Sequence, residues 1–141
     1  NWYDTFNEYT HTDLFKSFFF NFSLKLQSRF LSKAKLRNIE TLQLSENKIK
    51  FLPKSVKWEK ITDLYLNANP ISELPSYIGK LNTLKCLQLS KTRITSVPAS
   101  IMELVHLEEL DLSRNSLTTL PEGFFDRLTV LRKLDVRYDY N

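Results

Sequence analysis

The feature of this sequence that most restricts its fold is a block of apolar residues that returns every 22 to 24 residues. In each complete block the first, fourth, sixth, eleventh and fourteenth positions are apolar, and a proline follows the last of them. The blocks begin at Ile39, Ile61, Leu84, Leu107 and Leu131. A period of this length is typical of a solenoid, in which each coil buries its apolar side against its neighbours.

The order of residues inside one block predicts how each coil is built. The fourth and sixth positions alternate around a single polar residue, as a short strand with one buried face requires. Asparagine occupies the ninth position of three blocks, and its amide can both donate and accept, so stacked asparagines can satisfy the backbone groups of successive turns. Thr92 replaces the asparagine in the third block, which predicts a weaker rung at this position of the asparagine ladder, as we call the stack of ninth-position side chains. The proline fixes the start of a return segment. Apolar residues are expected to pin the return segments to the core at Val56, Ile78, Ile101 and Phe124.

The phrase that runs from Leu74 through Pro75 and Ile78 to Leu81 resembles the leucine-rich-repeat family. The resemblance covers residues 39–141, and its type is that of intracellular Ras-suppressor-like repeats and of short bacterial leucine-rich-repeat effector proteins. It implies an α/β solenoid, an arc with a parallel β-sheet on its concave face.

The segment 1–38 lies before the repeats and is expected to form a tail and a helical cap over the open end of the solenoid. Phenylalanines and leucines recur at helical spacing between Phe15 and Phe30. A competing interpretation takes alternate residues from Phe18 to Leu26 as a strand. The absence of β-branched valine and isoleucine favours the helix. A second alternative is an aromatic helix that binds a partner or a membrane.

The strand positions between the core leucines, and those just after them, form parallel rows on the concave face that the resemblance implies. Their side chains are polar and varied where the core positions are uniform, so these rows are free to specify a partner. Tyrosine and arginine dominate binding hot spots, so we expect the tyrosines and arginines of these rows to contribute most to partner binding. The candidate partner-binding residues are Gln43, Tyr65, Asn67, Gln88, Lys91, Asp111, Arg114, Arg137 and Tyr138. The competing interpretation is that charged residues of these rows are solvated or pair with one another across strands.

The residues that enzymes and metal sites require are scarce. The chain has one cysteine, Cys86, and two histidines, His11 and His106, without metal-ligand spacing or a pattern that pairs a nucleophile with a base. Its two glycines, Gly79 and Gly123, form no phosphate-binding loop. Acidic and basic residues are mixed along a chain of net charge +4, and no run approaches a membrane span. We therefore expect no enzyme, no cofactor, no metal, no nucleic-acid partner and no membrane insertion.

The sequence favours a protein-interaction module that grips one folded partner on the concave face. The resemblance implies a small GTPase of the Ras/Rho class or another signalling protein, with Arg114 as the residue that could reach a nucleotide site. Low cysteine content favours a reducing compartment, the cytoplasm, which for a secreted bacterial effector is that of the host. We expect a monomer. The alternatives are a scaffold segment of a larger protein, whose open end stacks on further repeats, and membrane attachment through the aromatic segment.

Overall fold

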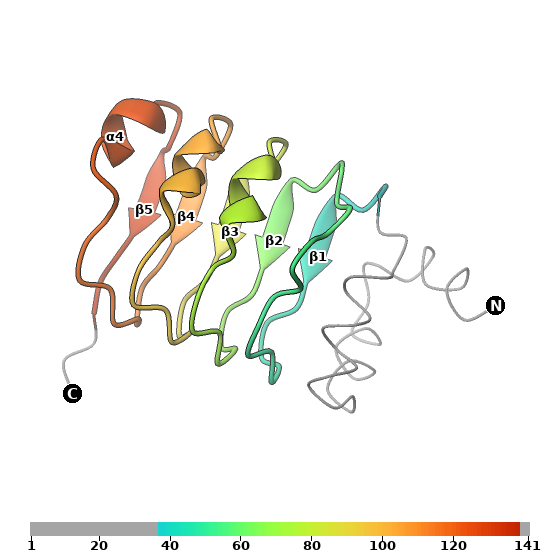
Figure 1. Ribbon diagram of the computed structural model, residues 1–141, viewed down its shortest axis with the longest axis horizontal. Helices are drawn as coiled ribbons and strands as arrows, with labels where there is room; N and C mark the ends of the chain where they lie inside the picture. The colour runs from blue at the N-terminus through green and yellow to red at the C-terminus, as the bar shows by residue number, and fades with distance from the viewer. Residues whose placement is uncertain (1–36, 139–141) are drawn as a thin grey trace.

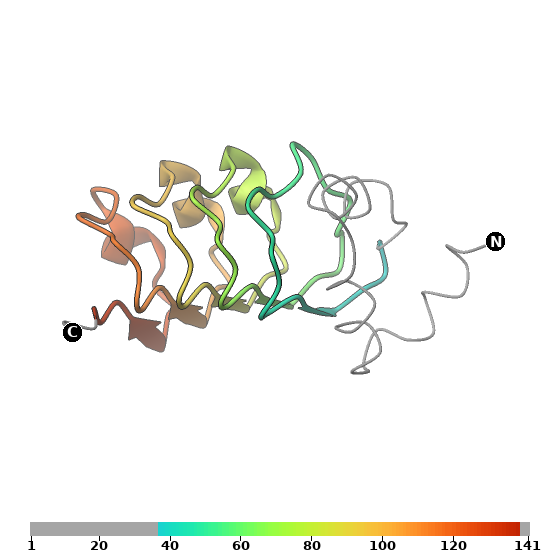
Figure 2. The same cartoon turned by 90° about the horizontal axis from the view of Figure 1, so that it is seen from below.

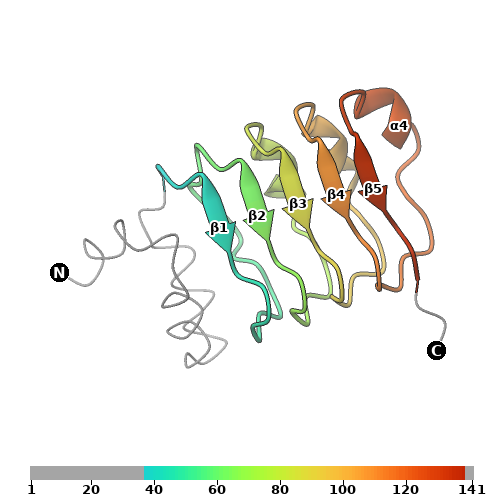
Figure 3. The ribbon, with the colours of Figure 1, turned by 180° about the vertical axis from the view of Figure 1, so that it is seen from behind.

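The computed structural model describes residues 37–138, which form a solenoid of five successive coils (Figure 1). Each coil contributes one short strand to a single sheet. The strands are β1 (Thr41–Gln43), β2 (Asp63–Tyr65), β3 (Cys86–Gln88), β4 (Glu109–Asp111) and β5 (Lys133–Asp135). All neighbouring strands are parallel and lie in the order β1-β2-β3-β4-β5, so strands that follow in sequence are neighbours in space (Figure 3). The predicted solenoid with a parallel sheet is confirmed.

The return segments run along the side of the solenoid opposite the sheet (Figure 2), and those of the second, third and fourth coils contain short helices. Two are 3-10 helices, η2 (Ser76–Lys80) and η3 (Ala99–Glu103), and one is a single α-helical turn, α4 (Phe124–Arg127). Pro75 and Pro98 stand directly before η2 and η3 in extended conformation, as the repeat pattern predicts. None of the helices in the described range is long and apolar enough to cross a membrane.

The N-terminal segment, 1–38, lies outside the described residues except for Arg37 and Asn38. The predicted tail and helical cap, and the strand and membrane-binding alternatives, therefore remain predictions. The description begins two residues before Ile39, the first residue of the first repeat block.

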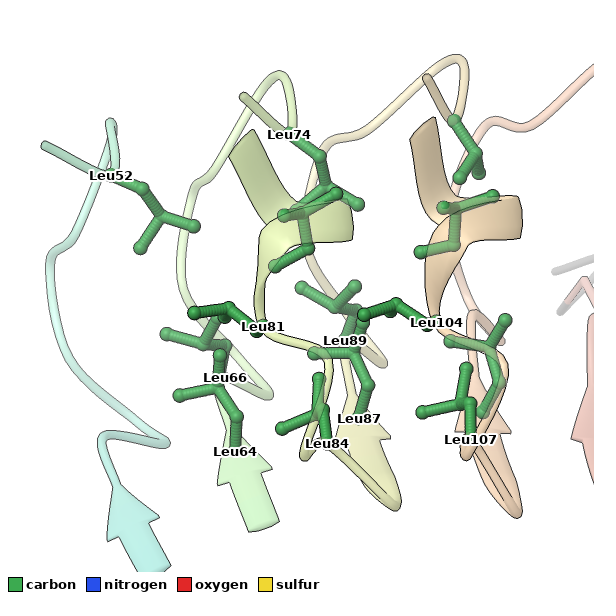
Figure 4. Close-up of a cluster of buried hydrophobic side chains, with 14 of the residues drawn as sticks. Leu52, Leu64, Leu66, Leu74, Leu81, Leu84, Leu87, Leu89, Leu104 and Leu107 are labelled. Atoms are coloured by element: carbon green, nitrogen blue, oxygen red, sulfur yellow. The ribbon is translucent and has the colours of Figure 1, made fainter. Parts of the chain in front are cut away.

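Leucines of successive coils stack into columns that fill the space between the sheet and the return segments (Figure 4). The central residue of each of the first three strands, Leu42, Leu64 and Leu87, is buried. Leu81 and Leu104, which directly follow η2 and η3, close the core from the other side. Truncating such a side chain to alanine costs about 2–5 kcal/mol. No coil could bury its apolar face alone, so the coils stabilise one another.

The predicted asparagine ladder is present behind the strands. The amide nitrogen of Asn115 donates to Leu89 O of the preceding coil at 2.7 Å and to Leu112 O of its own coil at 3.0 Å. Asn69 makes the equivalent bonds between the first and second coils. Asn69 and Asn115 therefore each satisfy buried carbonyls of two coils at once.

Thr92 forms the weak rung that the sequence predicts. Its hydroxyl lies 3.1 Å from Leu89 O in its own coil and 2.6 Å from Asn115 Oδ1 in the next. One hydroxyl proton can serve only one acceptor at a time. Within residues 37–138 neither contact of this hydroxyl reaches the preceding coil, so the side-chain ladder is interrupted between the second and third coils.

The turn after each of the first four strands passes through the left-handed region of backbone conformation. The eighth residue of each of the first four coils has a positive φ, at Glu46 (60°), Ala68 (53°), Lys91 (55°) and Arg114 (55°). None is a glycine, so the left-handed conformation costs each of these residues about 1 kcal/mol relative to a right-handed or extended backbone. The sharp turn lets the ninth side chain point back into the coil.

Gly79 allows the return segments of neighbouring coils to approach closely. A Cβ atom at this position would lie 2.2 Å from the carbonyl oxygen of Ser100 in η3. Real Cβ atoms do not come so close to a backbone oxygen, so a larger residue would push η2 and η3 apart.

Candidate protein-binding face

The outward face of the sheet, which we call the sheet face, consists of the two residues that flank the buried centre of each strand. These flanking residues are half-buried in β1, β2 and β4. The strands pair without a shift, so equivalent positions form two straight rows across the sheet. The first row holds Thr41, Asp63, Cys86, Glu109 and Lys133, and the central row holds Gln43, Tyr65, Gln88, Asp111 and Asp135.

Four of the candidate binding residues lie side by side in the central row. They are Gln43, Tyr65, Gln88 and Asp111, one from each of the first four strands. All four are half-buried, so part of each side chain is open to solvent. The structure thus gathers these residues on one surface, while their role in binding stays a prediction.

Three further candidates follow the strands. The side-chain oxygen of Asn67 accepts the N–H of Ser90 in the next coil at 2.8 Å, so this residue links two coils as well as facing outward. Lys91 and Arg114 are exposed and occupy the left-handed turn positions. Their side chains lie along the rim where the strands end.

The last two candidates, Arg137 and Tyr138, lie just after β5, and both are exposed. The guanidinium of Arg137 contacts the carboxylate of Asp135 through Nε at 3.0 Å and Nη2 at 2.5 Å. Side-chain and backbone hydrogen bonds from Arg137 lower the pKa of Asp135 to about 2. Arg137 therefore reaches the central row through Asp135.

Several sheet-face side chains also accept hydrogen bonds from backbone N–H groups, a role that the repeat pattern did not predict. Gln43 Oε1 accepts the N–H of Ser45 at 3.1 Å, and Asp111 Oδ1 accepts that of Ser113 at 2.9 Å. Asp135 Oδ1 repeats this pattern with the residue two places after it. Aspartate followed two positions later by a turn residue is a known signal for such a bond. Substituting these residues would therefore change the turn as well as the surface.

The sheet face carries charge opposite in sign to that of the whole chain. Its two rows hold four acidic residues and one basic residue, whereas the chain has a net charge of +4. Glu109 contacts Lys133 Nζ at 2.7 Å, as the cross-strand interpretation predicts. Asp63 and Asp111 accept hydrogen bonds from uncharged donors, the Thr62 hydroxyl and a backbone N–H. The middle of the face is therefore acidic, which favours a partner surface with basic side chains.

Cys86 lies at the centre of this face as a buried thiol. Gln88 Nε2 donates to its Sγ at 3.5 Å, and the phenol of Tyr65 lies beside it. Burial, and after it the negative charge of Glu109, raise the pKa of the thiol. A protonated, buried thiol is a poor nucleophile. No group of His, Cys, Asp and Glu suited to a metal ion occurs among the described residues.

A hollow of about 570 Å³ lies over the last three strands. Its polar lining includes Gln88 of β3, Asp111 of β4 and Asp135 of β5. Arg132 and Lys133 border the same hollow, and Arg132 Nη1 lies 3.5 Å from Glu108. The C-terminal half of the sheet face therefore offers a recess large enough for side chains of a partner.

Comparison with known sequences agrees with the repeat architecture. A family model described as the leucine-rich repeat region matches residues 60–140, more than half of the chain. The chain belongs to the leucine-rich-repeat family. Leucine-rich-repeat domains generally mediate protein–protein interaction and are typically binding modules without enzymatic activity.

Among solved structures, the chain is similar to a leucine-rich-repeat protein of Leptospira interrogans, with 27% sequence identity and a TM-score of 0.64. The match covers 80% of this chain and 28% of the Leptospira chain. This chain thus spans less than a third of the length of that leucine-rich-repeat protein. A search of curated proteins found no match.

Proposed function

We propose that this leucine-rich-repeat chain binds a folded protein partner on its sheet face. The observation that carries the proposal is the straight central row, in which Gln43, Tyr65, Gln88 and Asp111 stand on consecutive strands. The core positions behind this row are uniformly leucine, whereas the row itself varies from coil to coil. A face of five strands could bury about 800 Å² on each partner, the size of a standard specific interface.

Tyr65 is the side chain expected to contribute most to binding. It lies near the middle of the face, with Gln43 and Gln88 on the neighbouring strands. A tyrosine combines a large apolar ring with a hydroxyl at low cost in side-chain entropy, which is why such residues are frequent hot spots. The acidic side chains around it favour a partner whose contacting surface is basic.

The test begins with capture of binding proteins from a cell lysate on immobilised chain, followed by titration calorimetry with the captured protein. Tyr65→Ala should weaken binding at least about tenfold. Phe125→Ala is the matched control, because Phe125 is a highly exposed aromatic residue on α4, away from the sheet. Equal affinity for wild type and Tyr65→Ala, or a larger loss with Phe125→Ala, would place binding elsewhere.

The partner class that we propose is a small GTPase of the Ras/Rho class, met in the cytoplasm, which for a secreted bacterial effector is that of the host. The resemblance of the Leu74–Leu81 phrase to Ras-suppressor-like repeats and to bacterial effectors supports this class. Arg114 is exposed on the rim, where it could approach a bound nucleotide. Binding of GTP- and GDP-loaded GTPases to wild type, Arg114→Ala and Arg127→Ala tests the idea. A preference for one nucleotide state that Arg114→Ala alone abolishes is expected, and no binding in any combination would end it.

A scaffold role is the second candidate function. It is favoured by the last described coil, in which Val136 and Tyr138 are exposed. Such a coil could stack on further repeats of a larger protein. In that case binding to the sheet face would be weak, and substitutions at the open end would disturb assembly while Tyr65→Ala would not.

A further inference from the structure

The turns that follow the strands line up along one edge of the solenoid and carry a second charged surface (Figure 3). In these turns the ninth and eleventh residues of each coil pack into the core, whereas the eighth, tenth and twelfth are open to solvent. We call these open positions of the first four coils the turn rim. Five of its twelve residues are basic and one, Glu46, is acidic. The basic residues are Lys48, Lys50, Lys91, Arg93 and Arg114.

The backbone holds the turn rim of the third coil in place from both sides. Lys91 N donates to Ser113 O in the fourth coil at 3.1 Å, and Arg93 N donates to Ile71 O in the second coil at 2.8 Å. Thr92 between them is buried, so the side chains on either side of it share the outer face. A partner would therefore meet two positive charges that rest on an ordered backbone with a coil on each side.

The charges of Lys91 and Arg93 are not neutralised within residues 37–138. Both side chains are exposed, and neither forms an ion pair with an acidic residue of that range. Arg114 on the next coil differs, because it lies close enough to Asp135 to lower the pKa of that carboxyl group. Like charges on one face lower stability. The packing of the fold therefore gives no reason for Lys91 and Arg93 to stand together.

A neutral row separates the turn rim from the acidic sheet face. In the first four coils the two rows of the sheet face hold three acidic residues and no basic one. Three residues of extended chain, about 10 Å, lead from the central row to the turn rim. This distance is close to the Debye length of about 8 Å at physiological ionic strength, so each band presents its own charge to a partner. The neutral row consists of the seventh residues, Ser45, Asn67, Ser90 and Ser113.

We propose that the turn rim binds an acidic segment of a protein, with Lys91 and Arg93 at the centre of the contact. Carboxylates suit this surface, because a guanidinium group can pair with a carboxylate through two parallel hydrogen bonds. A short acidic segment can follow the rim across the coils without meeting the sheet face. A DNA duplex or an anionic membrane is wider than this band, so the acidic rows beside the rim would repel it.

The turn rim lies beside the sheet face, but the inference does not rest on the proposed function of that face. If the acidic segment belongs to the protein that docks on the sheet face, the two bands allow only one orientation of that protein. Turning it by half a turn would bring like charges together, which costs affinity.

An oligoglutamate peptide added to isotope-labelled chain tests the proposal by NMR titration. At low salt the peptide should shift the amides of Lys91, Arg93 and the neighbouring turns, and leave those of η2 and η3 unchanged. Lys91→Glu combined with Arg93→Glu should weaken binding of the peptide at least about tenfold, because both contacts become repulsive. Tyr65→Ala, which tests the proposed function, should leave the affinity for the peptide unchanged, so the two proposals can fail separately.

The matched control is Lys80→Glu combined with Arg127→Glu, which also reverses one lysine and one arginine. Both residues are exposed and lie on the helical side, at the ends of η2 and α4. This variant should bind the peptide within about threefold of wild type, and circular dichroism checks that each variant is folded. Equal losses in the two double variants would mean that only net charge matters and would overturn the proposal. A wild type that does not bind the peptide would overturn it too, as would tighter binding of a DNA duplex or of phosphatidylserine vesicles.

Discussion

The side-chain amide of Asn69 donates to the carbonyl oxygen of Leu44, one coil back, at 2.8 Å. The same nitrogen donates to Leu66 O of its own coil at 2.9 Å, and the side-chain oxygen accepts the N–H of Ile49 at 3.0 Å. One fully buried side chain thus joins two coils. Hydrogen bonds of this kind hold the strands in the register that forms the rows of the sheet face.

Asn69→Ala should lower the free energy of unfolding by about 3 kcal/mol, because it leaves buried backbone groups of two coils without partners. Asn47→Ala should cost only about 1 kcal/mol. Asn47 donates only within its own coil, and its side-chain oxygen has no partner among the described residues. Urea denaturation of both variants measures the difference. Equal losses would show that the bonds between coils add nothing to stability.

Ala68→Gly should stabilise the fold by about 1 kcal/mol, although glycine usually destabilises. Ala68 has a φ of 53°, which glycine adopts without the clash of a Cβ atom. Ala99→Gly is the control, because Ala99 begins η3 and has no positive φ. It should lower stability by about 0.5–1 kcal/mol. Thermal denaturation should therefore show shifts of opposite sign, and shifts of the same sign would contradict the backbone account.

Gly79→Ala should destabilise the fold by about 2–3 kcal/mol, because the new methyl group would meet the Ser100 carbonyl oxygen. Gly123→Ala should cost about 1 kcal/mol, for a different reason. Gly123 has a φ of 74°, but a Cβ atom there would meet nothing closer than 4.0 Å. Urea midpoints rank the two variants. A milder effect at Gly79 than at Gly123 would mean that η2 and η3 separate easily.

The pKa of Asp135 should depend on Arg137. The hydrogen bonds from Arg137 hold this pKa at about 2, below the ordinary value of 3.8. A pKa depressed in the folded state adds stability above the ordinary value, and the gain is lost as the pH falls from about 4 towards 2. Because Asp135 is open to solvent, the gain is small. Titration of its carboxyl carbon by NMR should show the midpoint rising in Arg137→Ala and unchanged in Arg132→Ala. A midpoint insensitive to Arg137 would refute this pairing.

The sequence was sufficient to predict the solenoid, the strand positions and the alignment of the rows. The reason is that every coil has apolar residues at the same positions and must bury them against its neighbours, so every coil adopts the same backbone path. Asp63 aligns with Cys86, and Tyr65 with Gln88, as counting from the repeat predicts. The weak rung at Thr92 could be predicted in the same way, because Thr92 occupies the ninth position but has no side-chain amide to bond both coils.

Other features could not be predicted because the residues concerned do not repeat. The left-handed turn positions hold Glu46, Ala68, Lys91 and Arg114, none of which is the glycine that usually marks a positive φ. The contact between Arg137 and Asp135 depends on rotamers of exposed side chains, which the pattern leaves open. The return segments vary between 3-10 and α-helical turns because their sequences and lengths differ from coil to coil.

The central claim is that the sheet face, and not the helical side, receives a protein partner. Amide chemical-shift mapping tests it most directly, using isotope-labelled chain and the partner captured in the Tyr65 experiment. We predict that the perturbed amides lie on β1 to β5 and the turns after them, around Tyr65 and Asp111. Perturbations centred on η2, η3 and α4, with the strand amides unchanged, would contradict the account.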